Sequence, residues 1–358
     1  RGLLFIMMHM LLNTIAAQQF KIEPWGALPD TTGFAGSFAG LIDNRVVVAG
    51  GSNFPGGGAP WLGSKKWWYD QVFLFDNKKR VWKRVGKLPL PLGYGVSVSL
   101  PEGLLCIGGS NAEGHSAGVL LLQLKEGILK TDTLQPLPLP LANTCGTLVQ
   151  NKIYIAGGIT APDAKTTTPF FYELDLSKGL QNARWKELPS WPGPPRMLAV
   201  AAAVGTTFYL LSGAQLVNGQ RVYLRDGYRF SERTGWVKIA DLPFPVVAAP
   251  SPLMHDKQHL FLLGGDDGEN AGKDLREAHP GFSKKMLVYD YRKNTWSVQN
   301  NTNEIVPFIA VTTTAVLWNG QWIIPGGEIK PGIRTPQVLR VSQKRTITDH
   351  AAERKKIL

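Results

Sequence analysis

The segment RVVVAGG, residues 45–51, is an apolar strand that ends in a pair of glycines, and the same pattern recurs along the chain. The other copies end at Gly109, Gly158, Gly213, Gly265 and Gly327. In the copy that ends at Gly213, Ser212 replaces the first glycine. Six copies at intervals of about 50 to 60 residues are typical of a β-propeller, in which each repeat forms one blade.

The remainder of each repeat has the elements of a four-stranded blade. After the glycine pair comes a variable loop, and then an apolar strand such as QVFLFD (71–76), FFYELD (170–175) or MLVYDY (286–291). In several copies a tryptophan then precedes a proline-rich turn, as Trp82 precedes GKLPLP and Trp185 precedes ELPSWP. The pattern resembles Kelch repeats, in which the glycine pair ends the second strand and the tryptophan packs on the fourth. The sequence therefore predicts an all-β fold, a six-bladed Kelch-type β-propeller.

The two ends of the repeat region complement each other. Residues 20–30, FKIEPWGALPD, look like the fourth strand of a blade, with its tryptophan at Trp25. The sixth repeat has a third strand, QVLRVS (337–342), and then continues into a basic segment. We therefore expect the amino-terminal strand to complete the last blade, because such closure removes open sheet edges.

Charge and composition narrow the class of partner. The chain has 39 Lys+Arg and 27 Asp+Glu, which gives a net charge of +12. The basic residues are scattered as singles and pairs, and the one dense cluster lies between Lys344 and Lys356. Because no basic helix or aromatic RNA-binding motif interrupts the strand repeats, nucleic acid is not an expected partner. An acidic small molecule is compatible with the positive charge.

The first residues have the pattern of a secretory signal. RGLLFIMMHMLLNTIAAQQF begins with a positive charge, continues with an apolar run over residues 3–12, and has small residues at Ala16 and Ala17. The apolar run is too short to span a bilayer. We therefore expect an exported, periplasmic protein. The predicted division is a signal peptide (1–18), a propeller (19–345) and a basic carboxy-terminal tail (346–358).

The cysteines and histidines do not suggest metal chemistry. Cys106 and Cys145 stand in apolar strands without Cys-x-x-Cys or Cys-His spacing, so we expect no metal and no cofactor. We expect buried thiols, and an exported protein would also permit a disulfide as the alternative. A copper oxidase of the galactose oxidase type, which also has a Kelch propeller, would need histidine and tyrosine ligands and a cysteine crosslinked to tyrosine. His255 and His259 flank a turn between two strands, and neither cysteine lies in a loop suited to that crosslink. This oxidase is the weaker alternative.

A polar stretch follows the last glycine pair. In GGEIKPGIRT, residues 326–335, Glu328 comes directly after the pair, in the loop between the second and third strands of the blade. Loops of this kind lie at one rim of a propeller, around the mouth of the central channel. The Pro331-Gly332 dipeptide favours a type II turn with glycine at the position of positive φ. Such a turn would bring Glu328 and Arg334 toward the same pocket.

The stretch GGEIKPGIRT resembles the loop of the N-acetylneuraminate epimerases, the sialic acid mutarotases, that carries a glutamate and an arginine. Residues 33–51 and 93–109 are also similar to that family, as are residues 65–75 more loosely. The order of the matching blades indicates a cyclically permuted form, with the same ring cut at a different blade. The resemblance implies a six-bladed propeller and an isomerase that interconverts the α and β anomers of N-acetylneuraminate.

The resemblance carries two catalytic positions over to this chain, Glu328 and Arg334. Mutarotation requires a proton to leave the anomeric hydroxyl and one to reach the ring oxygen, which a carboxyl group can shuttle. A guanidinium is a natural partner for the carboxylate of sialic acid, and Lys330 would add positive potential. The other interpretation of the Glu328 and Arg334 pair is a solvated surface ion pair. Three further candidates for substrate contacts, each equally compatible with a structural role, are Arg196, Asn53 and Tyr94.

A function of another class also fits the repeats. Kelch propellers often bind proteins or glycans at their rim without catalysis, and a fold alone does not determine function. A secreted module that binds a sialoglycan or a protein is therefore the alternative to the epimerase. The two hypotheses differ in whether the protein accelerates the equilibration of the sialic acid anomers.

Overall fold

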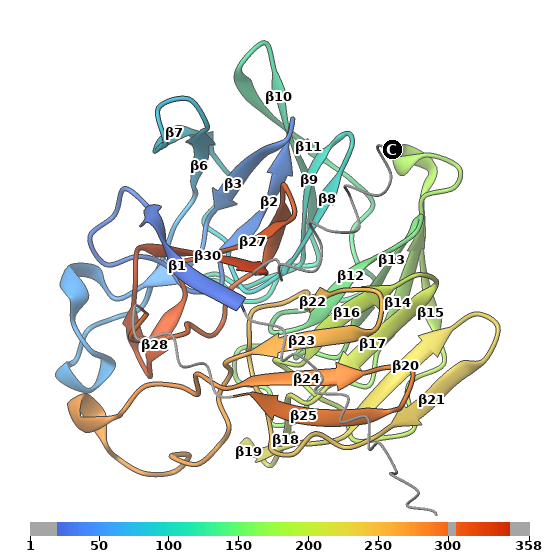
Figure 1. The fold of residues 1–358 in the computed structure, drawn as a ribbon. Coiled ribbons are helices and arrows are strands. Elements are labelled where there is room, and N and C mark those ends of the chain that lie inside the picture. Colours follow the sequence, from blue (N-terminus) through green and yellow to red (C-terminus); the bar gives the residue numbers. More distant parts are fainter. Residues whose placement is uncertain (1–19, 300–305, 344–358) are drawn as a thin grey trace, which may run out of the picture.

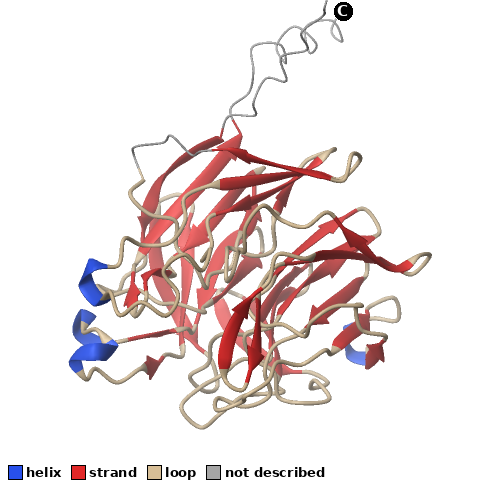
Figure 2. Cartoon of the chain, turned by 90° about the horizontal axis from the view of Figure 1, so that it is seen from below, coloured by secondary structure: helices blue, strands red, loops and turns tan. Residues whose placement is uncertain are grey.

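Six antiparallel sheets of four strands each form a β-propeller, as the repeats predicted (Figure 1). The computed structural model describes residues 20–299 and 306–343. The predicted signal peptide (1–18) and the basic tail (346–358) lie outside the described residues. Figure 2 shows that strands dominate the molecule and that its few short helices lie in the connecting loops. The helices of the described residues are all 3-10 turns: η1 (Pro55–Gly57), η2 (Pro60–Leu62), η3 (Leu180–Asn182) and η4 (Arg276–Ala278).

The first three blades follow the chain in order. Blade 1 contains β2 (Phe38–Ile42), β3 (Arg45–Ala49), β6 (Gln71–Asp76) and β7 (Val81–Lys87). Blade 2 contains β8 (Val96–Leu100), β9 (Gly103–Ile107), β10 (Val119–Lys125) and β11 (Ile128–Thr133). Blade 3 contains β12 (Cys145–Val149), β13 (Lys152–Ala156), β14 (Phe171–Asp175) and β15 (Trp185–Leu188).

The last three blades include the one that joins the two ends of the described chain. Blade 4 contains β16 (Val200–Val204), β17 (Thr207–Leu211), β20 (Gly227–Ser231) and β21 (Gly235–Ile239). Blade 5 contains β22 (Met254–His255), β23 (His259–Leu263), β24 (Met286–Asp290) and β25 (Thr295–Gln299). Blade 6 contains β26 (Val316–Trp318), β27 (Gln321–Pro325), β30 (Gln337–Gln343) and β1 (Phe20–Ala27).

Blade 6 confirms the predicted closure. Strand β1 pairs antiparallel with β30, with Phe20 opposite Gln343 and Ile22 opposite Val341. In Figure 1 the blue strand β1 lies beside the red strands β30 and β27, which come from the other end of the chain. Because the amino-terminal strand supplies the fourth strand of the last blade, the ring has no missing strand.

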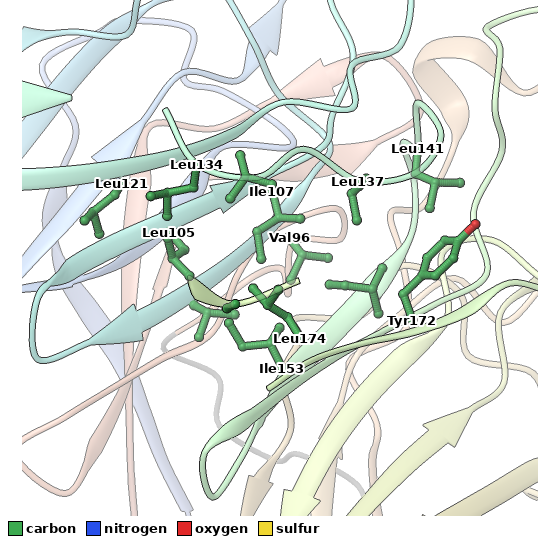
Figure 3. Close-up of a cluster of buried hydrophobic side chains, with 14 residues drawn as sticks. Val96, Leu105, Ile107, Leu121, Leu134, Leu137, Leu141, Ile153, Tyr172 and Leu174 are labelled. Atoms are coloured by element: carbon green, nitrogen blue, oxygen red, sulfur yellow. The ribbon is translucent and has the colours of Figure 1, made fainter. Parts of the chain in front are cut away.

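The hydrophobic core is divided among the blades, with one cluster between each neighbouring pair. In β3, Val46 and Val48 face blade 6, whereas Val47 and Ala49 face blade 2. Figure 3 shows the cluster in which side chains of blades 2 and 3 meet, including Val96 and Ile153. Both faces of each sheet are therefore buried, which explains why the second strands are apolar throughout instead of alternating with polar residues.

The glycine pairs recur because the chain turns there against the next blade. Gly50 and Gly51 have φ of 62° and 100°, in the region that favours glycine. A Cβ on Gly50 would lie 2.1 Å from the carbonyl oxygen of Leu92, in the segment that leads into blade 2. The N–H of Gly51 donates to that same oxygen at 2.8 Å. At the seam of the ring, the N–H of Gly327 donates to the carbonyl of Phe34 at 2.7 Å, so blade 6 is joined to blade 1 in the same way.

A closed ring of backbone hydrogen bonds surrounds the central channel. One residue of each blade donates its N–H to the carbonyl of the preceding blade's equivalent, at distances between 2.7 and 2.9 Å. Each of these residues has positive φ, from 53° to 69°. The six members are Gly36, Tyr94, Asn143, Leu198, Ala248 and Thr312. The ring fixes the position of each blade's inner edge, and the loops of the channel mouth are built directly on it.

None of the helices found in residues 20–299 and 306–343 has the length and apolar character needed to cross a membrane.

Candidate functional site

The residue that follows each glycine pair occupies an equivalent position at the channel mouth. Each forms a backbone bridge with the residue that precedes a member of the central ring, as Glu328 does with Val311 and Asp266 with Val247. The six equivalent positions are Ser52, Ser110, Ile159, Ala214, Asp266 and Glu328. Of these, Asp266 and Glu328 carry charge, and they belong to neighbouring blades. Among these six positions, the acidic residues are therefore confined to blades 5 and 6.

Glu328 and Arg334 lie opposite each other in a hairpin. Strands β28 (Glu328–Lys330) and β29 (Ile333–Arg334) pair so that these two residues are partners across the ladder. The turn between them places Gly332 at φ 76°, as expected for the Pro331-Gly332 dipeptide. The two side chains form an ion pair, with 3.0 Å between Nη1 of Arg334 and Oε2 of Glu328. The N–H of Gly332 donates to Oε1 of Glu328 at 2.9 Å. The residues that the sequence predicted to converge are thus in direct contact.

Arg334 is enclosed, with its side chain 4% exposed, whereas that of Glu328 is 19% exposed. Its Nε and Nη1 are buried and have no hydrogen-bond partner among the described residues, since the contact with Glu328 lacks hydrogen-bond geometry. The guanidinium lies over the ring of Phe54, 5.0 Å from its centroid. The charge of Arg334 is balanced by Glu328, and a guanidinium in such surroundings is suited to pair with a further carboxylate from a ligand.

Arg334 also lines a cavity of about 290 Å³ at the seam between blade 6 and blade 1. The walls of this cavity include Phe54, Thr31, Thr32 and several glycines. Its volume is close to the lower end of the range for small-molecule sites. A smaller cavity, of about 80 Å³, lies at the central ring. Of these two cavities, the one beside Arg334 better accommodates a monosaccharide.

Lys330 contacts the neighbouring loop. Its Nζ donates to the carbonyl of Glu277 at 3.1 Å, and the carboxylate of Glu277 accepts a hydrogen bond from Nε1 of Trp61 at 2.6 Å. Glu277 belongs to η4, within the long loop of blade 5 that follows Asp266. This loop is therefore held against the hairpin of blade 6 and against the rim loop of blade 1.

Asp266, at the channel mouth, and His279, in the blade 5 loop that follows it, are polar residues that the sequence reasoning did not find. Tyr223 donates its hydroxyl to Oδ2 of Asp266 at 2.7 Å, and burial, followed by the Asp266 contact, raises the pKa of Tyr223 to about 12. His279 is buried, and its Nδ1 accepts the N–H of Gly281 at 3.1 Å. The position of Asp266, directly after the fifth glycine pair, is a signal that could have identified it by analogy with Glu328.

The three remaining candidates occupy different surroundings. Arg196 is fully buried and pairs with Asp226, with 2.7 Å between Nη2 and Oδ2. Asn53 is also buried, where it donates to the carbonyl of Gly33 at 2.9 Å and accepts from Tyr69 at 2.8 Å. Both therefore have their polar groups engaged within the protein. Neither forms part of the cavity beside Arg334.

Tyr94 lies at the channel mouth as a member of the central ring. Its hydroxyl is 2.7 Å from Oγ of Ser52, and the ammonium of Lys66 lies 4.1 Å from its ring centroid. Tyr94 lines the channel and not the cavity beside Arg334. Its contacts are compatible with a packing role.

A search of the described residues finds no group of three or more His, Cys, Asp or Glu side chains arranged to hold a metal ion. Cys106 and Cys145 are both buried and unbonded to each other. Burial raises the pKa of both thiols, that of Cys145 to about 12. The thiols therefore remain protonated at neutral pH, as is usual for cysteines that serve as small hydrophobic residues.

Comparison with known proteins connects the chain to one family. The family model described as N-acetylneuraminate epimerase matches residues 15–130 and 135–280. A protein of Yersinia pestis (strain Pestoides F) named N-acetylneuraminate epimerase is 43% identical over 120 residues, which are 28% of this chain and 30% of the relative. One of Brucella suis with that name is 37% identical over 114 residues, 30% of this chain and 29% of the relative.

A third relative matches a longer part of the chain. A protein of Haemophilus influenzae (strain 86-028NP), also named N-acetylneuraminate epimerase, is 28% identical over 233 residues, which are 57% of this chain and 58% of the relative. The alignments with the first relatives thus span less than a third of their length. The ranges matched by the family model include Asp266 and His279 and end before the hairpin that carries Glu328 and Arg334.

Proposed function

The chain belongs to the N-acetylneuraminate epimerase family, and from this premise we propose that it interconverts the α and β anomers of N-acetylneuraminate. The observation that carries the proposal is the contact between Glu328 and Arg334 beside a rim cavity of about 290 Å³. This places a carboxylate, which can move a proton, next to a buried guanidinium with unused donors. A sugar that bears a carboxylate at its anomeric carbon needs both groups in one place.

Arg334 would bind the substrate carboxylate. The guanidinium is largely shielded from water and lines the cavity, so a carboxylate bound there would pair with it beside Glu328. Phe54 supports the flat face of the guanidinium and restricts its orientation. Binding the carboxylate here would hold the adjacent anomeric carbon near Glu328, since the two side chains are 3.0 Å apart.

Glu328 would move the proton. Its carboxylate accepts the proton of the anomeric hydroxyl while the bond between the anomeric carbon and the ring oxygen breaks, and it returns that proton to the ring oxygen. The product is the open-chain ketone, whose carbonyl can present either face to the ring oxygen. The same steps in reverse close the ring and give either anomer. No group is oxidised or reduced, so the reaction requires no redox cofactor.

The proposal is tested by proton NMR after sialidase releases α-N-acetylneuraminate. We expect the wild-type protein to bring the anomers to equilibrium faster than buffer does, and Glu328→Gln to lower that rate about 10²- to 10⁴-fold. Arg334→Met should mainly raise KM, since it removes the carboxylate ligand. Glu269→Gln, an exposed site in the neighbouring loop, is the matched control and should keep wild-type activity. A wild-type protein no faster than buffer would reject the function, and a fully active Glu328→Gln would reject the mechanism.

We also propose that the protein is exported, because residues 3–12 and the small residues after them have the pattern of a signal peptide. Export would place the enzyme where sialidases release sialic acid from glycans outside the cytoplasm. Fractionation of cells that express the full gene tests this proposal. Recovery of the uncleaved chain in the cytoplasmic fraction would contradict it.

A further inference from the structure

We infer that Asp266 and His279 of blade 5 complete the site around Glu328, with His279 donating a hydrogen bond to the sugar's ring oxygen and Asp266 accepting one from a sugar hydroxyl. The inference rests on the proposed function and adds two substrate-contacting residues to it. It comes from the equivalence of positions around the channel mouth and from the contacts of the blade 5 loop.

Asp266 and Glu328 are held by the same backbone contacts on neighbouring blades. The N–H and C=O of Asp266 bond with those of Val247 at 2.8 and 2.9 Å, and those of Glu328 bond with Val311 at 2.9 Å in both directions. The residues after Val247 and Val311 are adjacent members of the central ring, since the N–H of Thr312 donates to the carbonyl of Ala248 at 2.7 Å. The backbones of Asp266 and Glu328 therefore occupy equivalent positions at the channel mouth.

The two carboxylates differ in their partners. Glu328 has Arg334 as a counter-ion, whereas no lysine or arginine in the described parts of the chain forms an ion pair with Asp266. Asp266 instead accepts the hydroxyl of Tyr223 at 2.7 Å and the N–H of Gly268 at 3.0 Å. A carboxylate has about four acceptor positions, so each oxygen of Asp266 retains capacity for a donor such as a sugar hydroxyl. Asp266 is thus oriented by the protein and remains available to a ligand.

His279 is oriented by its own loop. Its Nδ1 accepts the N–H of Gly281 at 3.1 Å, which leaves the proton of the neutral ring on Nε2. Burial lowers the pKa of His279, and the charge of Lys330 acts in the same direction, while Asp266 and Glu328 oppose it. At neutral pH the imidazole is therefore uncharged, with Nε2–H fixed as a donor. The ring of His279 lies 5.6 Å from that of Phe282, which packs against Val247 and Val311, the backbone partners of Asp266 and Glu328.

The blade 5 loop is anchored to the rim loop of blade 1 and to the hairpin of blade 6. Glu277 accepts from Trp61 of blade 1 and from Lys330 of blade 6, at 2.6 and 3.1 Å. Two residues beyond His279, a Cβ on Gly281 would lie 3.3 Å from the carbonyl oxygen of Ile329, the residue that follows Glu328. His279 therefore lies in a segment that packs directly against the hairpin of Glu328 and Arg334.

This arrangement suits the chemistry of ring opening. When Glu328 accepts the anomeric proton, the carbon–oxygen ring bond breaks and its electron pair goes to the ring oxygen. Nε2–H of His279 stabilises that oxygen through a hydrogen bond until Glu328 returns the proton, so His279 itself loses no proton. A fixed neutral donor aimed at a developing negative charge lowers the barrier more than it strengthens ground-state binding. Asp266, which would contact a hydroxyl remote from the reacting bond, acts on binding.

The test compares kinetics of variants that differ in donor capacity. We expect His279→Leu to lower kcat about 10²- to 10³-fold with KM changed less than about threefold, and His279→Gln, which retains an N–H donor, to recover part of the loss. Asp266→Asn should raise KM about tenfold with a smaller effect on kcat. Matched controls are His255→Leu and Asp274→Asn, both at exposed sites of blade 5, and both should behave as wild type. Urea unfolding shows whether each variant is folded.

A second readout does not depend on turnover. In nitrogen NMR of the wild-type protein, titration with N-acetylneuraminate should shift the Nε2 resonance of His279 and leave that of His255 unchanged. If the wild type has no epimerase activity but this shift occurs, the proposed function fails and the binding site stands. If the wild type is active while folded His279→Leu keeps full kcat, or if the Nε2 resonance does not move at saturation, the role of His279 is rejected. An unchanged KM in folded Asp266→Asn rejects the role of Asp266.

Discussion

Replacement of Arg196 by methionine should destabilise the propeller without changing its chemistry. The Arg196 side chain is fully buried and pairs with Asp226, whose side chain is 14% exposed. Its Nη1 donates to the carbonyl of Ser212 at 2.9 Å, in the blade that has a serine in its glycine pair. Arg196→Met replaces the arginine by an unbranched apolar side chain and leaves the Asp226 carboxylate without its cation. Breaking a buried pair in this way costs about 3–5 kcal/mol.

The measurement is urea unfolding followed by tryptophan fluorescence. With a slope of about 3 kcal/mol per molar urea, that loss lowers the midpoint by about 1–2 M. The double variant Arg196→Met/Asp226→Asn should recover a large part of the loss, because it removes the uncompensated charge as well. The rate of anomer equilibration per folded molecule should equal that of the wild type. A wild-type midpoint combined with a raised KM would refute the reasoning and would assign Arg196 to the substrate.

Two further predictions concern the closure of the ring and the response to acid. Ile22→Ala should lower the free energy of unfolding by about 2–5 kcal/mol, because Ile22 is fully buried in the strand that completes blade 6. As a control, Leu317→Ala at an exposed site should change the free energy of unfolding by less than about 0.5 kcal/mol. Equal effects of the two substitutions would argue against closure by that strand. Burial acts to raise the pKa of Asp290, but hydrogen bonds from Gln258 and two backbone amides lower it to about 2. The carboxylate therefore stabilises the fold above the unfolded pKa of about 4, and this contribution is lost as pH falls toward 2. Asp290→Asn should therefore be less stable than wild type at pH 7, with a difference in urea midpoint that closes between about pH 4 and 2, and a difference independent of pH would contradict this.

Much of the fold could be predicted because the same pattern of strands and turns recurs in six repeats. The glycine pairs mark where each second strand turns against the next blade, and the tryptophans Trp25 and Trp82 lie on fourth strands as expected. The hairpin of Glu328 and Arg334 was also accessible, since a Pro-Gly turn is a local feature. These elements share one property, which is that their structure depends on residues close in sequence or on the repeat itself.

What could not be predicted depends on contacts between distant segments. Arg196 is buried by a partner 30 residues away, which only the pairing of β17 with β20 brings to it. The loop that carries His279 has no repeat equivalent, and its position is determined by contacts of Glu277 with Trp61, 216 residues away in the chain. Sequence patterns contain no measure of these distances. For this reason the polar side of the site supplied by blade 5 became visible only in three dimensions.

The seam that closes the ring and the candidate substrate cavity are built from the same residues. Thr31 and Thr32, which line the cavity, lie in the connection between β1 and the first strand of blade 1. Gly33 has φ 77°, and a Cβ there would lie 2.0 Å from the carbonyl carbon of Thr335, the neighbour of Arg334. The connection between blade 6 and blade 1 is therefore in close contact, at Gly33, with the segment that positions the guanidinium of Arg334. Because a propeller is closed at one place only, a defect in that closure should loosen the Arg334 side of the site before it affects blades on the far side of the ring.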